Sequence, residues 1–192
     1  MQTPSTKVKH LSMQELEAGL DHIRQSPKDN GVLKMIVRRP DTLQREVLEE
    51  GTIDLKEGLL GDNWSRRPSS RTPDKSPHPD MQLNIMNARA IALLAQTEDR
   101  WQLAGDQLLV DMELSDENLP AGTQLSIGSA IIEVTTQPHN GCKKFAQRFG
   151  IDAVKFVNSP IGKELHLRGI NAKVIQGGMI RKGDVVRKLL NG

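Results

Sequence analysis

From residue 32 onward, the chain consists mainly of short segments in which apolar and polar residues alternate. Alternation with a period of two places one set of side chains on the buried face of a β-strand. The segments that carry this pattern span residues 32–38, 81–86, 108–114, 124–127, 130–135 and 185–190. Gly, Pro, Asn or Asp separates most of them, and residues 47–60 hold a further apolar set broken by glycines. This pattern predicts many short strands joined by turns.

Two segments instead follow the period of an α-helix. Ser12 and Glu15 have the spacing of a capping box, and Leu16, Leu20 and Ile23 then follow one helical face. Residues 87–96 are rich in Ala and Leu, and Asn87 has the residue type favoured at a helix N-cap. We therefore predict a helix in the N-terminal region and a second helix within the strand-rich part.

The glycine pairs of the C-terminal part indicate turns. Residues 173–176 and 179–181 flank Gly177 and Gly178, which predicts a β-hairpin at this point. Closely spaced strands with few helices predict a mainly β fold of the α+β type, with a barrel-like sheet and peripheral helices. We expect residues 1–31 to form an N-terminal helical extension and residues 32–192 to form the main domain.

Composition limits the possible partners. The 192 residues have a net charge of +2 and only 3% aromatic residues, so neither a strongly basic surface nor stacking side chains indicate nucleic acid as a partner. No apolar run reaches the roughly 18 residues needed to span a membrane, and no signal peptide is visible. We expect a cytoplasmic protein without a nucleic-acid or membrane partner. The single cysteine excludes a disulfide within the chain and a multi-cysteine zinc site.

Residues 63–80 are predicted to form a long loop. The segment contains no aliphatic side chain and several prolines, and its cationic residues include Arg66, Arg67 and Arg71. Charge of this kind is most often simply solvated, so the loop alone does not identify a ligand.

The only cysteine, Cys142, follows a turn signal at Asn140 and Gly141 and precedes a helical segment at residues 143–149. A helix N-terminus and the nearby Lys143 and Lys144 favour the thiolate form of a cysteine. Free cysteines are also commonly buried as small apolar residues. A pairing of Cys142 with His139, three residues earlier, is a further arrangement to consider. Position alone therefore leaves structural and functional interpretations of Cys142 open.

Several segments, taken in order, resemble the MOSC domain, the C-terminal module of molybdenum cofactor sulfurases that also occurs in small standalone proteins. Gly105–Leu108 and Leu119–Gly122 resemble its early segments, and Ile127–Val134 resembles its strand of the type IGxAxLEV. Pro138–Phe145 places Cys142 at the position of the family's characteristic cysteine, and Arg168–Val185 resembles the closing segment. The resemblance covers roughly residues 32–190.

The resemblance implies a strand-rich barrel that binds the molybdenum cofactor, molybdopterin, or that transfers sulfur. It makes Cys142 the candidate catalytic residue and molybdenum ligand, because a soft thiolate suits a soft metal centre as well as a persulfide. An anionic pterin cofactor carries a phosphate, to which arginine offers paired hydrogen bonds. The candidate cofactor-binding residues are Arg66, Arg67, Arg71, Arg89, His139 and Lys143.

The resemblance leaves the activity open. The chain has no room for the pyridoxal-phosphate domain of full-length sulfurases. We expect the extra N-terminal barrel domain of larger MOSC reductases to be absent or reduced, which argues against full reductase activity. The protein is then a molybdenum-dependent reductase, a sulfurtransferase component served by a redox or sulfur-donor protein, or a noncatalytic binding module with a structural cysteine. Copurified metal, a sulfur adduct on Cys142 or an inert thiol would distinguish these hypotheses.

Overall fold

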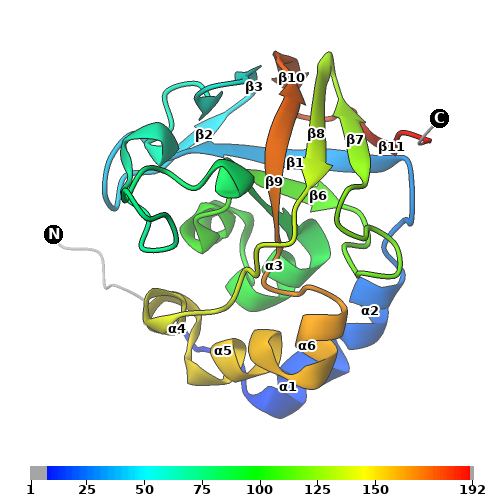
Figure 1. Cartoon of the computed structure of the whole chain (residues 1–192). Helices are drawn as coiled ribbons and strands as arrows, with labels where there is room; N and C mark the ends of the chain where they lie inside the picture. The colour runs from blue at the N-terminus through cyan, green and yellow to red at the C-terminus, as the bar shows by residue number, and fades with distance from the viewer. Residues whose placement is uncertain (1–7, 191–192) are drawn as a thin grey trace, which may run out of the picture.

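A closed barrel of seven strands forms the centre of the protein, as a computed structural model that describes residues 8–190 shows (Figure 1). The strands run in the order β11-β7-β8-β9-β5-β6-β1, and β1 pairs with β11 to close the ring. The strands are β1 (Gly31–Arg38), β5 (Leu83–Asn87), β6 (Leu108–Asp111), β7 (Gln124–Ile127), β8 (Ala130–Val134), β9 (Ile170–Gln176) and β11 (Val185–Lys188). Neighbours are antiparallel except for β5 and β6, which run parallel. The predicted mainly β barrel is confirmed.

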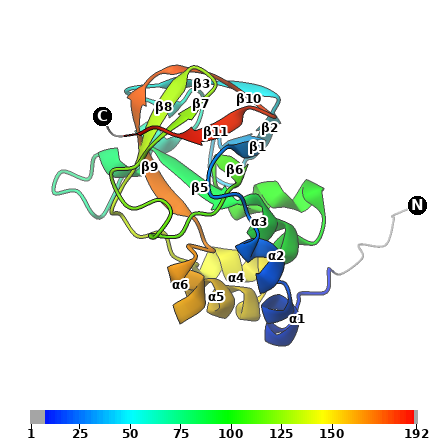
Figure 2. The same ribbon diagram turned by 90° about the vertical axis from the view of Figure 1, so that its right-hand side faces the viewer.

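Smaller elements extend this barrel. β2 (Glu46–Leu48) pairs with β1, and a second sheet contains β3 (Glu50–Asp54), β4 (Gly58–Leu59) and β10 (Gly178–Arg181). The helices gather at the opposite end of the barrel (Figure 2). They are α1 (Met13–Ala18), α2 (Leu20–Arg24), α3 (Ala88–Ala95), α4 (Lys143–Phe149), α5 (Ile151–Asn158) and α6 (Pro160–Glu164). Short 3₁₀ turns occur at η1 (Trp64–Arg66), η2 (Pro79–Met81) and η3 (Glu98–Ala104).

The alternation of the strands divides their side chains between two hydrophobic clusters. On β6, Leu108 and Val110 point into the barrel, whereas Leu109 faces the helices. The pairing of β1 with β6 shifts register between Leu33 and Met35, so Leu33 and Ile36 both belong to the interior cluster. A bulge of this kind changes which face a side chain occupies. The second cluster, between barrel and helices, contains all three phenylalanines of the chain.

The predicted N-terminal helix is present with its capping box, in which Ser12 and Glu15 each accept a hydrogen bond from the other's backbone N–H. The helix is interrupted at Gly19, which separates α1 from α2. A Cβ atom at Gly19 would stand 2.6 Å from the Leu93 side chain, so the glycine allows this segment to approach α3 closely. Leu16 and Ile23 are buried against the helical layer.

The predicted hairpin at Gly177 and Gly178 is wrong. β10 pairs with β3 in the small sheet, whereas β9 pairs with β5 and β8 in the barrel. Neither glycine has the positive φ that a tight hairpin turn needs. A Cβ atom at Gly178 would stand 2.5 Å from the Ser129 carbonyl carbon. Gly178 therefore allows close packing against the β7–β8 turn.

Candidate functional site

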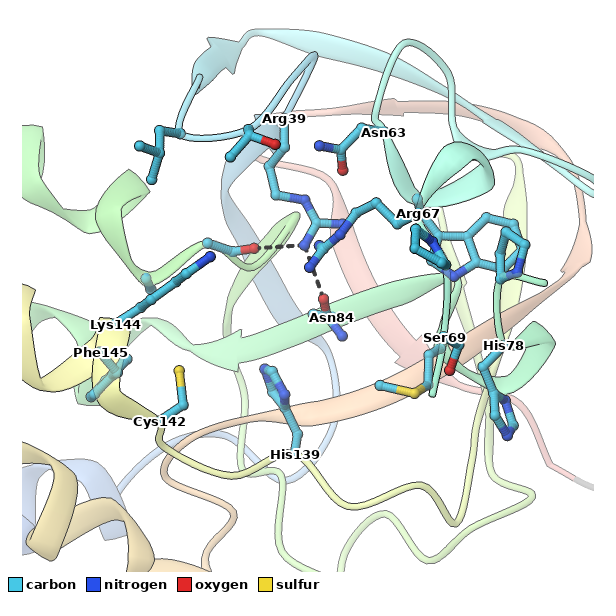
Figure 3. Close-up of a pocket in the computed structure, with 18 of the residues that line it drawn as sticks. Arg39, Asn63, Arg67, Ser69, His78, Asn84, His139, Cys142, Lys144 and Phe145 are labelled. Carbon is cyan, nitrogen blue, oxygen red and sulfur yellow. Dashed lines mark hydrogen bonds between the residues drawn. The ribbon is translucent and has the colours of Figure 1, made fainter. Parts of the chain in front are cut away.

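A pocket of about 420 Å³ opens beside the helical end of the barrel (Figure 3). Its walls come from the segment after β1, the loop of residues 63–81, the end of η3 and the start of α4. Small-molecule sites in proteins typically measure about 300–1,000 Å³. The cationic residues that line the pocket are Arg39, Arg45, Arg67, Arg71, Lys144, Arg148 and Arg168.

Cys142 lines this pocket and is exposed. It occupies the residue before α4 in an extended conformation, with φ −125° and ψ 178°. The Asn158 side chain holds the preceding peptide, because its Oδ1 accepts from Gly141 N at 2.9 Å and its Nδ2 donates to Gly141 O at 3.1 Å. A Cβ atom at Gly141 would stand 2.8 Å from Val157. Helix α5 therefore fixes the position from which the thiol enters the pocket.

A buried carboxylate, Asp106, joins two pocket residues. One oxygen contacts His139 Nε2 at 2.8 Å, and the other accepts from Arg168 Nη1 at 2.7 Å. Burial opposes ionisation, but the positive charge of Arg168 and the contact with His139 hold the pKa of Asp106 below its usual value. Burial, followed by the charge of Arg168, lowers the pKa of His139 despite the neighbouring carboxylate. His139 is then neutral at pH 7 and donates its Nε2–H to Asp106, which leaves Nδ1 with a lone pair.

Gly169 makes room for His139. Its φ of +113° lies in a region that favours glycine, and a Cβ atom there would stand 2.3 Å from Ile85 O and 3.1 Å from His139 Cδ2. Arg168, the residue before it, lies with its guanidinium carbon 4.8 Å from the centre of the Phe145 ring. The Arg168–Gly169 pair thus positions the imidazole and the guanidinium together.

A second buried ion pair, between Arg39 and Asp62, contributes Arg39 to the pocket lining. Arg39 donates to both oxygens of Asp62, from Nε at 2.8 Å and from Nη2 at 2.7 Å. Its Nη1 donates to Asn84 Oδ1 at 3.1 Å and to Gly105 O at 3.0 Å (Figure 3). Every nitrogen of this guanidinium therefore has a protein acceptor, and Arg39 is fixed in place.

Other cations of the pocket are not neutralised by the protein. Within residues 8–190, the ion pairs formed by arginine involve Arg24, Arg38, Arg39, Arg89, Arg168 and Arg181. Arg45, Arg67 and Arg148 are absent from that set, and Asp41 is the single carboxylate among the pocket's described lining residues. Burial and the charges of Arg148 and Arg39 lower the pKa of Arg45 to about 10. Burial and Arg39 also lower the pKa of Arg67. Such a surplus of positive charge favours an anionic ligand.

The structure brings four of the residues singled out from the sequence into the pocket and places three outside it. Cys142, His139, Arg67 and Arg71 line the cavity. Of the others, Arg66 donates to Pro40 O, Arg89 pairs with Asp111 at 2.7 Å, and Lys143 is exposed at the start of α4. Among residues 8–190, no group of three or more His, Cys, Asp or Glu side chains is placed to hold a metal ion.

The sequence reasoning missed Arg39, Arg45, Lys144, Arg148 and Arg168 as pocket residues. For Lys144 and Arg148 the sequence did contain a clue, because a spacing of four residues places both cations on the same face of a helix. Arg39 and Arg45 come from the segment between β1 and β2, whose approach to α4 is a property of the tertiary fold.

Comparison with known protein families gives a match to the MOSC domain over residues 73–187. No curated protein matches the sequence. Among solved structures, the YuaD protein from Bacillus subtilis is similar, with a TM-score of 0.60 and 15% identity over 81% of this chain and 93% of that one. YiiM from Escherichia coli gives a TM-score of 0.54 and 19% identity over 84% of this chain and 71% of that one. YiiM from Geobacillus stearothermophilus gives a TM-score of 0.51 and 14% identity, covering 87% and 76%. At these identities, the likeness establishes the fold alone.

Proposed function

Because the chain belongs to the MOSC domain family, which is associated with molybdenum-cofactor-related proteins, we propose that its pocket binds the molybdenum cofactor and that Cys142 ligates the metal. The observation that carries the proposal is the exposed Cys142 thiol in a pocket lined by seven cationic side chains, namely Arg39, Arg45, Arg67, Arg71, Lys144, Arg148 and Arg168. A soft thiolate and a cationic surround are what a soft metal and a phosphate-bearing pterin require.

The residues present fit this group. A metal ion alone would lack ligands, because no cluster of three or more ligating side chains lies within the described residues. A cofactor that brings its own sulfur ligands needs only one from the protein, and Cys142 is placed to supply it. Arg67 and Arg71, on the loop of residues 63–81, are the candidates to bind the cofactor phosphate. When bound, the cofactor supplies a redox-active metal centre.

The other pocket residues orient and isolate the ligand. Asp106 holds His139 in the tautomer that carries the proton on Nε2, so Nδ1 can accept a proton or hydrogen bond. Arg39 is held by Asp62, and Asn84 shares the same network. These contacts engage every nitrogen of Arg39, so this residue shapes the wall, and cations without a carboxylate partner, such as Arg67, are the candidates to bind an anion.

Metal and pterin analysis tests the proposal. The protein is made in a host that synthesises the cofactor, purified without oxygen, and analysed for molybdenum by mass spectrometry and for pterin by fluorescence after oxidation. Wild type should carry both, and Cys142→Ser should lose most of the molybdenum, because a hydroxyl is a poor ligand for a soft metal. Gln147→Ala, on α4 but outside this pocket, is the control and should keep both. Wild type without molybdenum or pterin would refute the proposal.

The loop arginines provide a matched comparison. Arg67 and Arg71 line the pocket, whereas Arg66 lies on the same loop and donates to Pro40 O outside it. The double variant Arg67→Ala/Arg71→Ala should retain less pterin than Arg66→Ala. Equal retention in the two variants would remove the loop from the binding site.

Sulfur carriage by Cys142 is the second candidate function, because the thiol is exposed and a donor protein can reach it. Intact-protein mass spectrometry would detect one added sulfur on wild type and none on Cys142→Ser. An exposed thiol also argues against the alternative of an inert packing residue. A redox partner or sulfur donor would act at the mouth of the same pocket.

A further inference from the structure

Two guanidinium groups converge over Gly105 without a carboxylate between them. A methyl group added to Gly105 would stand 3.3 Å from Arg45 Nη2 and 3.7 Å from Arg148 Nη1. Arg45 comes from the β1–β2 segment and Arg148 from α4, so two separate walls of the pocket bring them together. Arg148 is also the largest electrostatic influence on Arg45.

The protein satisfies these groups only in part. Arg45 Nη1 donates to Gln44 O at 2.6 Å and Arg148 Nη1 donates to Leu103 O at 2.7 Å. Arg45 Nε is buried and has no hydrogen-bond partner among the described residues. Neighbouring like charges cost free energy, and an anion bound between the two guanidinium groups would relieve that cost.

Lys144 extends this arrangement toward Cys142. It lines the pocket one helical turn before Arg148 on α4 and follows Cys142 by two residues. Figure 3 shows the Lys144 side chain extending into the cavity on the side of Cys142 and Phe145, whereas Arg67, Ser69 and His78 approach from the other side. Lys144 and Arg67 therefore enter the cavity from two different sides.

Gly105 leaves space beside the guanidinium groups of Arg45 and Arg148. It ends η3 with a φ of +87°, a conformation that favours glycine, and its missing side chain leaves space below the two guanidinium groups. Its carbonyl is already occupied, because it accepts from Arg39 Nη1 at 3.0 Å. A ligand at this point would meet N–H donors.

We propose that Arg45, Arg148 and Lys144 form an oxyanion slot over Gly105 that binds a carboxylate or phosphate group of the substrate, beside the metal held by Cys142. The proposal rests on the proposed function, because it leaves the cofactor phosphate to Arg67 and Arg71 on the loop of residues 63–81. The substrate is accordingly an anion, bound through its acidic group with its reactive part directed at Cys142.

The slot is tested first by anion titration of the protein without cofactor. The Nε–Hε signals of ¹⁵N-labelled arginine are followed by NMR while inorganic phosphate, and separately acetate, is added. The signals of Arg45 and Arg148 should shift and saturate with at least one of the two anions, and the stronger one indicates the type of acidic group. Arg45→Gln and Lys144→Gln should each weaken this binding at least about tenfold, as expected for loss of a charge-assisted contact.

Controls separate the slot from general charge effects and from misfolding. Arg24→Gln, at an exposed ion pair on α2, should bind the anion as wild type does. Lys144 is exposed on α4, so Lys144→Gln tests the slot even where Arg45→Gln unfolds the segment. An absence of saturable binding in wild type, or equal affinity in wild type and both slot variants, would overturn the proposal.

Cofactor analysis distinguishes the two proposals. Protein from the cofactor-making host should retain the same pterin and molybdenum after Arg45→Gln, while its affinity for the anion falls. Loss of pterin from Arg45→Gln would show that the slot holds the cofactor phosphate and would overturn the substrate assignment. A wild type without pterin that still binds the anion in the slot would refute only the proposed function.

Discussion

The hydrophobic cluster within the barrel consists of Leu, Ile, Val, Ala and Met, whereas the wall of the pocket buries two ion pairs, Arg39–Asp62 and Arg168–Asp106. Both regions exclude water, but packing stabilises the first and charge pairing stabilises the second. Apolar burial tolerates changes of pH and salt, while a buried ion pair fails when one partner is removed. The barrel therefore supports the pocket by supplying stability that does not depend on the charges of the pocket.

The largest effect is expected from removing one buried charge. Asp106→Ala leaves the Arg168 guanidinium, 9% exposed, without a counter-ion and should lower the free energy of unfolding by about 3–5 kcal/mol. Chemical denaturation measures the change. Asp111→Ala is the matched control, because Asp111 and Arg89 are 19% and 21% exposed, and it should cost about 1 kcal/mol. Equal losses of unfolding free energy in the two variants would mean that burial does not increase the contribution of the Arg168–Asp106 pair to stability.

A barrel substitution should come next in size. Leu108 is completely buried, and Leu108→Ala removes its side chain from the interior cluster, at a cost of about 3 kcal/mol within the usual range of 2–5. Unlike Asp106→Ala, this change should leave the pH dependence of stability as in wild type. Chemical denaturation at pH 7 and pH 5 measures the free energy of unfolding of both variants. A pH dependence in Leu108→Ala that differs from wild type would show that the barrel interior and the pocket are energetically coupled.

Acidification should destabilise the pocket in two stages. The pKa of His139 is lowered in the folded state, so the unfolded chain takes up a proton below about pH 6.5 before the folded protein does. Stability from this residue is therefore present above about pH 6.5 and lost as pH falls toward the folded pKa, by about 1.4 kcal/mol for each unit of difference. The lowered pKa of Asp106 adds a second loss below about pH 4.

His139→Asn removes the first stage and should flatten the stability profile between about pH 5 and 7. Thermal unfolding across this range provides the measurement. If His139→Asn keeps the wild-type dependence of stability on pH, then a titrating group other than His139 causes that dependence. Leu108→Ala should retain the slope.

The smallest effect on stability is expected at Cys142. The residue is exposed and precedes a helix, so Cys142→Ser should change the free energy of unfolding by no more than about 0.5 kcal/mol. The same variant should lose its molybdenum. A Ser variant that melts markedly earlier and retains full metal content would instead identify Cys142 as a packing residue.

Local patterns in the sequence predicted the strands and caps well. The alternation at residues 124–127 and 130–135 corresponds to β7 and β8, and Asn87 caps α3 by accepting from Arg89 N and Ala90 N. The pairing of β10 could not be predicted in this way. It depends on contact with β3, more than a hundred residues earlier, and on the close approach of Ser129 to Gly178.

The site was only partly predictable for a related reason. Cys142 and His139 lie in one segment with a clear turn signal, so the sequence identifies both. The positive charge of residues 63–80 can likewise be read from their composition. No sequence spacing predicts that Arg45 and Arg148 lie close together, because only the tertiary fold brings them both next to Gly105. Arg66 and Arg67 are neighbours in the sequence, but only Arg67 lines the pocket, since the 3₁₀ turn directs the two side chains differently.

The closure of the barrel sets an order on how the fold forms during synthesis. β1 joins β11 through Gly31–Val186 and Val32–Val185, so the ring can close only after residue 186 has left the ribosome. Contacts so distant in sequence are slow to form, because a long loop must be ordered before they can stabilise it. The pocket walls are synthesised earlier, at residues 39–168, but they rest on a barrel that is still open. A cofactor would therefore enter after β11 has closed the barrel.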